Sequence, residues 1–590
     1  MPYTIGQDFR LGVDRRRRRV AGPPGSLWDL ENAHLTRGGD VEKRMKFVAM
    51  WTVPANTFGL KVSTGAVYVF GSAAPGTLTI PAGVTYQQFV APSGADMTAL
   101  NDVCLFNGLI YASATFSDGG TYHFYNGVWV QSWQDGVVQS YTTSLSQIAA
   151  RIAALINANT AELATATSAG NVVTITGNTP NIPLSVTAEA VSGGVLTDQT
   201  AVALTTRAAS VSVPEITTVT LGGSLQLGNR FSVFVGTGTG HAYGADGNPL
   251  SMGLKLITYG AKIYAMVGSL AYFCAVDDPM TWRANLNGGG FINVANQEQG
   301  SVTITGAGKY YTQMAFFSTD SVQIWTLDPD PTINAISQTL LATGALAGRS
   351  VAPYGNNDTF YLSRSGLRSL RQRSVTGAPF ANDSGNSIDA LLIAEMLALG
   401  TTTTSLANGA IETINGRYML ALGTKIYVLS DFPGSKISAW SWYAPTEIPN
   451  FSADWVSVDL GNYYVRSGNT IYLYGGANGS TYDSSSEDNY VVTVGLPFSG
   501  GRKTNTDKVA TAYEVSVINT WLIEALIDPR NENIRVTAGL ATEDTYPDQI
   551  HPSSFDGKAF AMQFTCSTPG PATLTNYALA YEELETLEGL

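Results

Sequence analysis

The chain has 590 residues, of which 13% are charged and 44% are hydrophobic, and it contains 61 Gly and 25 Pro. This composition suits a turn-rich, well-packed β protein better than a disordered or helical one. Lys and Arg number 33 against 46 Asp and Glu, so the formal net charge is 33 − 46 = −13 and the surface should repel nucleic acid on average.

The first 50 residues differ from the rest by a dense basic run before a Gly-Pro-Pro-Gly breaker and a basic pair after a Gly-Gly turn. Because guanidinium groups fit carboxylates and phosphates, we expect residues 1–50 to form a docking arm. A solvated basic tail is the alternative. The basic residues concerned are Arg15, Arg16, Arg17, Arg18, Arg19, Lys43 and Arg44.

Short apolar strands separated by turns rich in Gly, Asp, Asn or Ser recur along most of the chain. In the densest row, 258–371, Gly260-Ala261 and Gly268-Ser269 separate consecutive strands. Such units bury both faces only when neighbours stack around an axis, so the pattern predicts an all-β, β-propeller-like ring of antiparallel meanders. No copy has the Gly-His…Trp-Asp signature of WD40 repeats. Further copies of the pattern lie at 59–72, 101–133, 414–443 and 460–476.

Residues 137–212 interrupt the meanders. Between 144 and 163, Ile148, Ile152, Leu155 and Ile156 recur at helical spacing, with Ser144 and Ser146 as possible N-caps. Alternating strands follow, so we expect a small α+β insertion. Its Thr-, Ala- and Val-rich strands would be exposed edges unless covered, which favours contact with a neighbouring subunit or a fibre; a loop insertion without function is the alternative.

These patterns divide the chain into five predicted parts. The amino-acid composition changes once at the end of the arm and again at the start of the C-terminal region. The strands expected in the C-terminal region predict a β-rich platform. The predicted divisions are 1–50 for the arm, 51–136 for the first propeller strands, 137–212 for the insertion, 213–485 for the main blades and 486–590 for the platform.

Two sets of residues are of types found in ligand sites, but neither has the surrounding sequence that such a site requires. Gly236, Gly238 and Gly240 suggest a phosphate loop, but no Lys-Ser/Thr follows, so no nucleotide cofactor is predicted. The four histidines lie far apart and form no metal-binding pair, which argues against a metal hydrolase.

Several short motifs follow one another in a definite order: Leu30, Asn32-Ala33, Gly38-Gly39 and Lys43-Arg44, then 316–325, 328–331, 366–370 and 387–389. This order resembles the tail nozzle proteins, or tail tubular protein B family, of short-tailed bacteriophages. Many members have Arg-Pro-Gly where this chain has Arg44-Met45-Lys46.

The resemblance implies a structural virion protein, assembled in the host cytoplasm and located in the viral tail. Six copies would form a ring that extends the DNA channel for genome retention and ejection. The expected partners are the other copies of the homo-hexamer, a head-to-tail adaptor or portal-side ring, and a tail fibre or tailspike. Double-stranded DNA would pass through the lumen without specific binding. The basic residues would then dock on the adaptor ring.

A lumen through which a duplex slides should be acidic, because each cation that neutralises a phosphate adds attraction. We expect acidic turns to line it, with Asp277, Asp278, Asp328 and Asp330 as candidates. The same residues raise the alternative of a polysaccharide-binding or polysaccharide-degrading tail propeller, because glycosidases use paired carboxylates. Asp-Asp-Pro and Asp-Pro-Asp-Pro are also typical of turns, so we predict no enzyme activity; a Ca²⁺ site there stays open.

The three cysteines, Cys104, Cys274 and Cys566, are widely separated and lie in apolar strands, which predicts buried free thiols. The first residues have no apolar signal core, and no apolar run reaches about 18 residues. We therefore expect neither export nor a membrane anchor.

Overall fold

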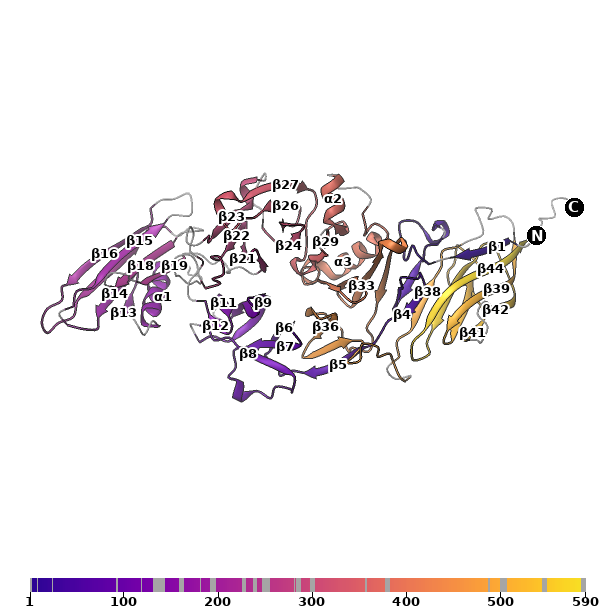
Figure 1. Ribbon diagram of the computed structural model, residues 1–590, viewed down its shortest axis with the longest axis horizontal. Helices are drawn as coiled ribbons and strands as arrows, with labels where there is room; N and C mark the ends of the chain where they lie inside the picture. Colours follow the sequence, from indigo (N-terminus) through magenta and orange to yellow (C-terminus); the bar gives the residue numbers. More distant parts are fainter. Residues whose placement is uncertain are drawn as a thin grey trace.

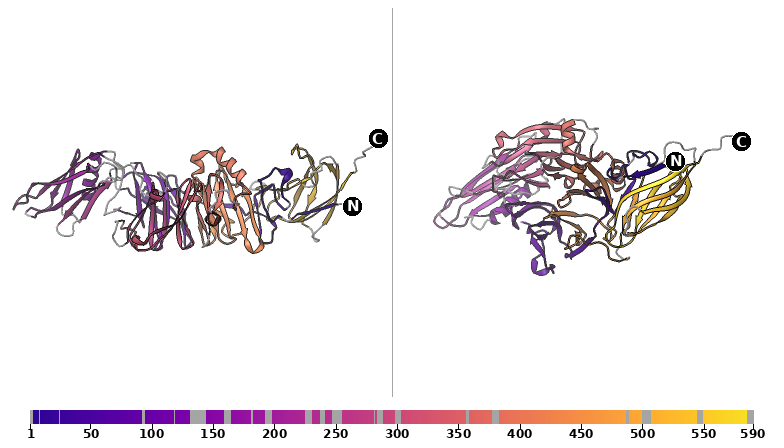
Figure 2. Two further views of the ribbon diagram at one scale, coloured as in Figure 1. Left: turned by 90° about the horizontal axis from the view of Figure 1, so that it is seen from above. Right: turned by 45° about the vertical axis from the view of Figure 1, so that its right-hand side comes forward.

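The protein is an elongated row of three β-rich parts: an inserted module, a central propeller and a platform near both chain ends (Figures 1 and 2). The computed structural model describes residues 3–7, 9–23, 25–91, 94–117, 119–130, 144–158, 164–180, 182–191, 198–224, 230–236, 241–246, 255–280, 282, 288–297, 303–355, 358–376, 383–485, 489–498, 507–543 and 549–584.

The central part is a β-propeller whose described strands form seven blades. The predicted turns form: Gly260, Ala261 and Gly268 have φ values of 55°, 58° and 57°, the left-handed backbone that tight hairpins need. The blades are β6 (Phe58–Ser63), β7 (Ala66–Gly71) and β8 (Val84–Gln88); β9 (Met97–Phe106), β10 (Leu109–Phe116), β11 (Thr121–Tyr125) and β12 (Val128–Trp129); β20 (Lys255–Tyr259), β21 (Lys262–Val267), β22 (Leu270–Phe273) and β23 (Gly290–Asn293); β24 (Gly306–Tyr310), β25 (Gln313–Phe317), β26 (Ser321–Thr326) and β27 (Ala335–Leu341); β28 (Ala352–Tyr354), β29 (Asp358–Ser363) and β30 (Gly366–Ser369); β31 (Asn408–Glu412), β32 (Arg417–Leu422), β33 (Lys425–Phe432) and β34 (Ile437–Tyr443); and β35 (Trp455–Asp459), β36 (Asn462–Ser467) and β37 (Thr470–Tyr474), with β5 (Phe47–Thr52).

The first strands of the blades close a ring around the axis. They contact one another in the order β6, β9, β20, β24, β28, β31, β35 and back to β6. The last blade takes its outer strand from the N-terminal region, because β5 pairs with β37. The ring is therefore closed by hydrogen bonds between segments that lie more than 400 residues apart in sequence.

The module inserted between β12 and β20 is a helix packed with two antiparallel sheets. The carbonyl oxygen of Ser144 accepts hydrogen bonds from Gln147 N and Ile148 N at the start of α1, and α1 buries the predicted apolar side chains. The sheets have the orders β13-β14-β17-β16 and β15-β18-β19 and share one core with α1. The elements are α1 (Leu145–Ala158), β13 (Ala164–Ala169), β14 (Val172–Gly177), β15 (Ser185–Val191), β16 (Thr200–Arg207), β17 (Ile216–Gly222), β18 (Arg230–Gly236) and β19 (His241–Asp246).

The predicted division of the insertion from the main blades at 212/213 is wrong. β17 and β18 follow that point, yet they pair with β14 and β15. The module therefore extends through β19, and the blades resume at β20.

The platform is built from both ends of the chain as two facing sheets. One has the order β3-β4-β44-β39-β42 with β1 on β44, and the other contains β38-β43-β40-β41. Side chains of both sheets share one core. The strands are β1 (Tyr3–Gln7), β2 (Asp29–Glu31), β3 (Ala33–Leu35), β4 (Val41–Lys43), β38 (Val492–Gly495), β39 (Lys508–Ile518), β40 (Trp521–Leu526), β41 (Arg535–Ala541), β42 (Gln549–Gly557), β43 (Ala561–Cys566) and β44 (Thr573–Glu583).

β2 joins the platform to the propeller. It pairs parallel with β34 and antiparallel with β38, so one nine-stranded sheet runs from a blade into the platform. The prediction of residues 1–50 as a separate arm is therefore wrong, because β1 to β4 belong to the platform sheets and β5 to a blade.

Two further helices, α2 (Leu370–Thr376) and α3 (Asp389–Thr404), follow β30 and pack against its blade. None of the helices within the described residues is both long and apolar enough to span a membrane. The three cysteines are buried free thiols, as predicted.

Candidate functional site: the axial cavity of the propeller

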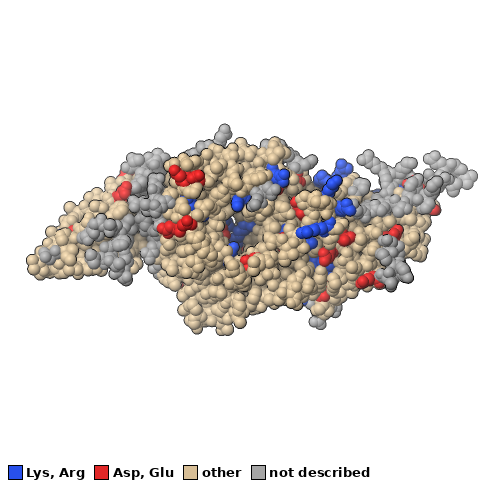
Figure 3. All heavy atoms as spheres, in the orientation of Figure 1, with Lys and Arg blue, Asp and Glu red and all other residues tan. Residues whose placement is uncertain are grey.

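A cavity of about 320 Å³ lies on the propeller axis. Its walls come from β6, β9, β20, β24, β31 and β35 and from the segment between η5 (Gly348–Ser350) and β28. Figure 3 shows the corresponding opening near the middle of the propeller, with Lys and Arg side chains visible inside it. Because all seven blades contribute, the cavity forms only when the ring closes.

Arg349 in η5 is held at the cavity by residues of two other blades, those that begin with β9 and β35. Its Cζ lies 3.7 Å from the centre of the Trp455 ring. Its Nη2 donates to the carbonyl oxygens of Leu100 and Asn101, at 3.3 and 3.0 Å, and its Nη1 donates to the carbonyl oxygen of Asp454 at 3.2 Å. Its Nε is buried without a hydrogen-bond partner among the described residues. The guanidinium charge is thus held by carbonyl dipoles rather than by a carboxylate, and burial lowers the pKa of Arg349.

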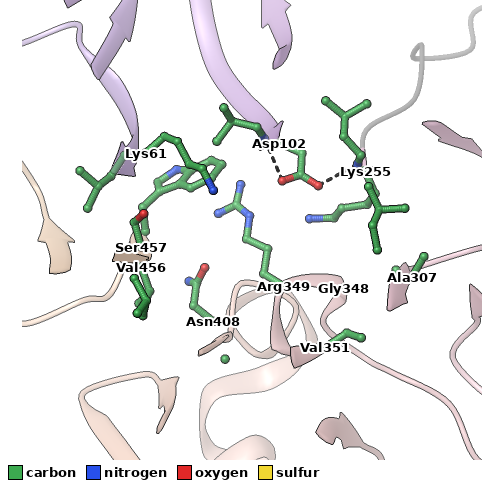
Figure 4. Close-up of a pocket in the computed structure, with 18 of the residues that line it drawn as sticks. Lys61, Asp102, Lys255, Ala307, Gly348, Arg349, Val351, Asn408, Val456 and Ser457 are labelled. Atoms are coloured by element: carbon green, nitrogen blue, oxygen red, sulfur yellow. Dashed lines mark hydrogen bonds between the residues drawn. The ribbon is translucent and has the colours of Figure 1, made fainter. Parts of the chain in front are cut away.

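Two lysines from other blades point toward the same space. Figure 4 shows Lys61 of β6 and Lys255 of β20 extending toward the cavity beside Arg349. Neither Nζ atom has a hydrogen-bond or ion-pair partner among the described residues. Burial lowers the pKa of Lys255 to about 8, against an upward effect of Asp102 and with a further downward effect of Arg349. Lys255 is therefore mostly charged at pH 7, although its charged form is poorly solvated.

Asp102 of β9 supplies the single carboxylate among the described lining residues. Its Oδ1 accepts from Val103 N at 2.9 Å and its Oδ2 accepts from Leu256 N at 2.8 Å, which ties β9 to β20. Three cations and one carboxylate give the lining a formal charge of 3 − 1 = +2. A chain with a net charge of −13 thus holds a positive cavity at its centre.

Sequence reasoning missed this cavity because its residues come from strands spread over most of the chain. A weak signal does exist. Lys61 and Lys255 both follow Gly-Leu and precede an aliphatic residue, in Gly-Leu-Lys-Val and Gly-Leu-Lys-Leu. Both lysines lie in the first strand of a blade, so the repeat marks an equivalent position in two blades.

The structure separates the predicted docking residues into two groups. Arg16, Arg17 and Arg18 are exposed, and Arg16 forms an ion pair with Asp14 at 2.6 Å. Arg15 is partly buried; its guanidinium group pairs with Asp29 and lies over Trp28.

The docking prediction is wrong for three of the seven residues, because the protein itself encloses them. Arg19 is 4% exposed and pairs with Glu532 at 2.9 Å. Lys43 has no exposed side-chain surface and pairs with Asp483 at 2.7 Å, and Arg44 is equally buried. These side chains hold the platform together and present no surface to a partner.

The four acidic candidates lie in turns, as their sequence pattern also suggested. Asp278 Oδ1 accepts from the backbone of Met280 at 3.0 Å in the turn after β22. Asp328 Oδ1 accepts from Asp330 N, and Asp330 caps η4 (Pro331–Ile333) between β26 and β27. These turns connect outer strands, and none of the four carboxylates, including Asp277, lines the axial cavity. Their place at the lumen of a six-copy ring stays a prediction.

Hydrolytic chemistry finds little support in the described part of the chain. Glycoside hydrolysis needs two carboxylates about 5–9.5 Å apart. The described lining of the axial cavity has one. No group of three or more His, Cys, Asp or Glu side chains among the described residues is arranged to hold a metal ion.

Comparisons with known proteins return remote structural likenesses. No protein-family model and no curated protein matches this chain. The Neurospora crassa Pan2 WD40 domain matches with a TM-score of 0.22 and 11% identity, over 42% of this chain and 72% of that one. The Phanerochaete chrysosporium exo-β-1,3-galactanase matches with a TM-score of 0.17 and 9% identity, over 83% of this chain and 98% of that one. At these scores neither likeness carries an argument, so the propeller assignment rests on the strand order.

Proposed function

We propose that this chain is a structural subunit of the tail nozzle ring of a short-tailed bacteriophage. Six copies form the ring, which extends the DNA channel for genome retention and ejection. The observation that carries the proposal is that residues of separate resemblance motifs meet in space at two joints of the molecule.

The first joint connects the N-terminal motif residues to the propeller and the platform. Asn32 Oδ1 accepts from Arg44 Nε and from Ala444 N, both at 2.9 Å, and Asn32 Nδ2 donates to the carbonyl oxygen of Val491 at 2.8 Å. The Arg44 guanidinium group donates to both oxygens of Glu447, at 2.6 and 2.7 Å. Asn-Ala and Lys-Arg in the motif thus serve one buried junction.

The second joint connects two motifs that are about 20 residues apart. Arg368 donates through Nη1 and Nη2 to the two carboxylate oxygens of Asp389, at 2.8 and 2.9 Å. Gly366 has φ 115°, and a Cβ there would lie 1.9 Å from Asp389 Oδ1. The Gly-Leu-Arg-Ser and Ser-Ile-Asp motifs therefore constrain each other, which is why they would occur together in a related protein.

The shape also suits a ring subunit. The insertion and the platform lie on opposite sides of the propeller (Figure 2). A subunit with separate β modules at its two ends can contact one partner at each end, such as an adaptor ring and a fibre. A propeller between them would form the body of the ring.

The test is the assembly state of the purified full-length chain. We expect mass photometry and negative-stain images to show six-fold rings, and duplex DNA to bind more weakly than micromolar at 150 mM salt because the lumen does not grip phosphates. A monomer that releases reducing sugar from host polysaccharide would replace this proposal with the polysaccharide-degrading alternative. A hexamer with tight duplex binding would contradict the sliding channel.

A further inference from the structure

We propose that the axial cavity binds a small oxyanion of the phosphate class, either inorganic phosphate or the phosphate group of a sugar phosphate. This inference is independent of the nozzle proposal, because the cavity belongs to one chain and needs no ring. It rests on the charge of the cavity, on the donors that face it and on its size.

The charge of the lining matches a dianion. Lys61, Lys255 and Arg349 converge from three blades, and Asp102 is the one opposing charge among the described lining residues. The backbone N–H groups of Val103 and Leu256 occupy both oxygens of Asp102. Like charges held together in a partly buried space repel each other, so the empty arrangement is costly. An anion with two negative charges would neutralise the formal +2.

The donors also lack partners of their own. The Nζ atoms of Lys61 and Lys255 bind no other described residue. The Nε of Arg349 is buried and unpaired among the described residues. Buried polar groups normally have partners, so the unpaired Arg349 Nε indicates a missing acceptor. The two lysine ammonium groups face the open cavity, where they can donate to further oxygens of the same ligand. Phosphate has this chemistry.

The size and walls favour a small ligand over a nucleotide. A cavity of about 320 Å³ lies at the lower end of the range for ligand pockets. The aromatic ring of Trp455 is already covered by Arg349 at 3.7 Å, so that face is not open to stack a base. Phosphate or a sugar phosphate fits these limits.

The binding test is calorimetric titration of the full chain at pH 7 with inorganic phosphate and, separately, with glucose 6-phosphate. Lys255→Met should weaken binding about tenfold or more, because a charge-assisted hydrogen bond is lost. Lys61→Met should weaken binding by a similar factor, because it removes a second cation of the lining. The matched control is Lys309→Met, which changes an exposed lysine of β24, a strand whose first residues line the cavity. It should leave the Kd within twofold.

Thermal unfolding of the two lysine variants separates the proposal from simple misfolding, because neither Lys61→Met nor Lys255→Met should lower the Tm while both weaken binding. Tighter binding of phosphate than of glucose 6-phosphate identifies the free ion as the ligand, and the reverse order identifies the sugar phosphate. Absence of heat with both probes at 10 mM, about the weakest binding such a titration detects, would overturn the proposal. So would a Kd that Lys255→Met and Lys61→Met both leave within twofold of the unmodified chain, because the anion would then bind elsewhere.

Discussion

Arg44 has no exposed side-chain surface, and its partner Glu447 is nearly as buried. Removing one member of a buried ion pair leaves an uncompensated charge and costs about 3–5 kcal/mol. We therefore expect Arg44→Ala to lower the midpoint of thermal unfolding clearly in calorimetry. The control is Arg364→Ala, because the Arg364–Asp320 pair is 65% and 64% exposed and should contribute less than about 1 kcal/mol. Equal losses in the two variants would contradict the role given to the buried joint.

His34 gives the protein a specific acid sensitivity. Its Nδ1 lies 2.8 Å from the Tyr443 hydroxyl and its Nε2 lies 3.5 Å from Glu42 Oε2. Burial, helped by the charge of Arg417, lowers the pKa of His34 from 6.5 to about 4, so the folded protein keeps it neutral at pH 7. The unfolded chain binds a proton there between pH 6.5 and 4 that the folded chain does not. Stability should therefore fall as the pH decreases through this window.

The measurement is the urea midpoint of wild type and His34→Asn at pH 7 and at about pH 4.5. A shift of this size corresponds to roughly 3 kcal/mol at its full extent. The variant should lose less stability than wild type on acidification, because it lacks both the proton uptake of His34 on unfolding and the lowering of the Glu42 pKa by His34. The remaining carboxylates should affect both proteins equally. Parallel losses in the two proteins would assign the acid sensitivity to other groups.

Lys255 should make oxyanion binding depend on pH in the alkaline range, in contrast to the acid sensitivity that His34 causes. The charged groups that face it are Asp102 on β9, Arg349 in η5 and, across the cavity, Lys61 on β6. With a pKa of about 8, Lys255 is charged at pH 7 and loses its proton as the pH rises through 8. Phosphate affinity should therefore fall between pH 7 and pH 9. In Lys255→Met the decline should be absent, and an equal decline there would remove Lys255 from the explanation.

At the scale of elements, α1 is the core of the inserted module. Ile152 is fully buried between the helix and the sheets. Ile152→Ala should destabilise the module by about 2–5 kcal/mol. Hydrogen exchange measured by mass spectrometry should show lost protection in α1, β13 and β14, with the propeller blades unchanged. Ala154→Ser, an exposed substitution on the same helix, is the control. Loss of protection that spreads into the blades would show that the module is not a separate stability unit.

Local patterns predicted the strands and α1, because turns and one-sided helices depend on nearby residues. Gly260 and Gly268 adopt the left-handed turns that their sequence context suggested. α3 was not predicted. Its apolar residues do not form one face, since Leu397 is 79% exposed, and Gly400 interrupts it with φ 73°.

The limits of the parts and the axial cavity depend on pairing between distant segments, which no local pattern reports. β17 pairs with β14, which precedes it in the chain, and β5 pairs with β37, which follows it more than 400 residues later. The cavity collects Lys61, Lys255 and Arg349 from three blades. Their charges are visible in the sequence, but their convergence follows only from the closed ring.

At the scale of the whole molecule, Arg17 and Arg18 are exposed residues of the basic run that can meet a partner surface. Charge-assisted contacts of desolvated arginines contribute about 1.5–3 kcal/mol each. Replacing Arg17 and Arg18 with Ser should leave the Tm unchanged and abolish attachment to adaptor-bearing heads. Arg16 is kept because its guanidinium group pairs with the buried Asp14. Attachment would be followed by electron microscopy of mixed components at physiological salt.

The control for this experiment is Arg530→Ser, because Arg530 is 77% exposed and pairs locally with Asp528 in the platform. It should attach like wild type. If the Arg17→Ser/Arg18→Ser double variant also attaches normally, the adaptor contact lies elsewhere on the molecule. Arg15 and Arg19 are left intact because their substitution would disturb the contacts with Asp29 and Glu532.

The pairing of β5 with β37 also sets the order in which a growing polypeptide can mature. Thr52 and Thr470 pair in this ladder and are separated by 470 − 52 = 418 positions. At about 5–20 residues per second, the ribosome needs roughly 20–80 s to supply the second strand after the first. β1 and β4 wait still longer for β44, with which both pair. A chain whose translation stops early would keep unpaired strands in its N-terminal region and so be accessible to proteases and chaperones. Only fully translated chains would therefore accumulate as folded protein.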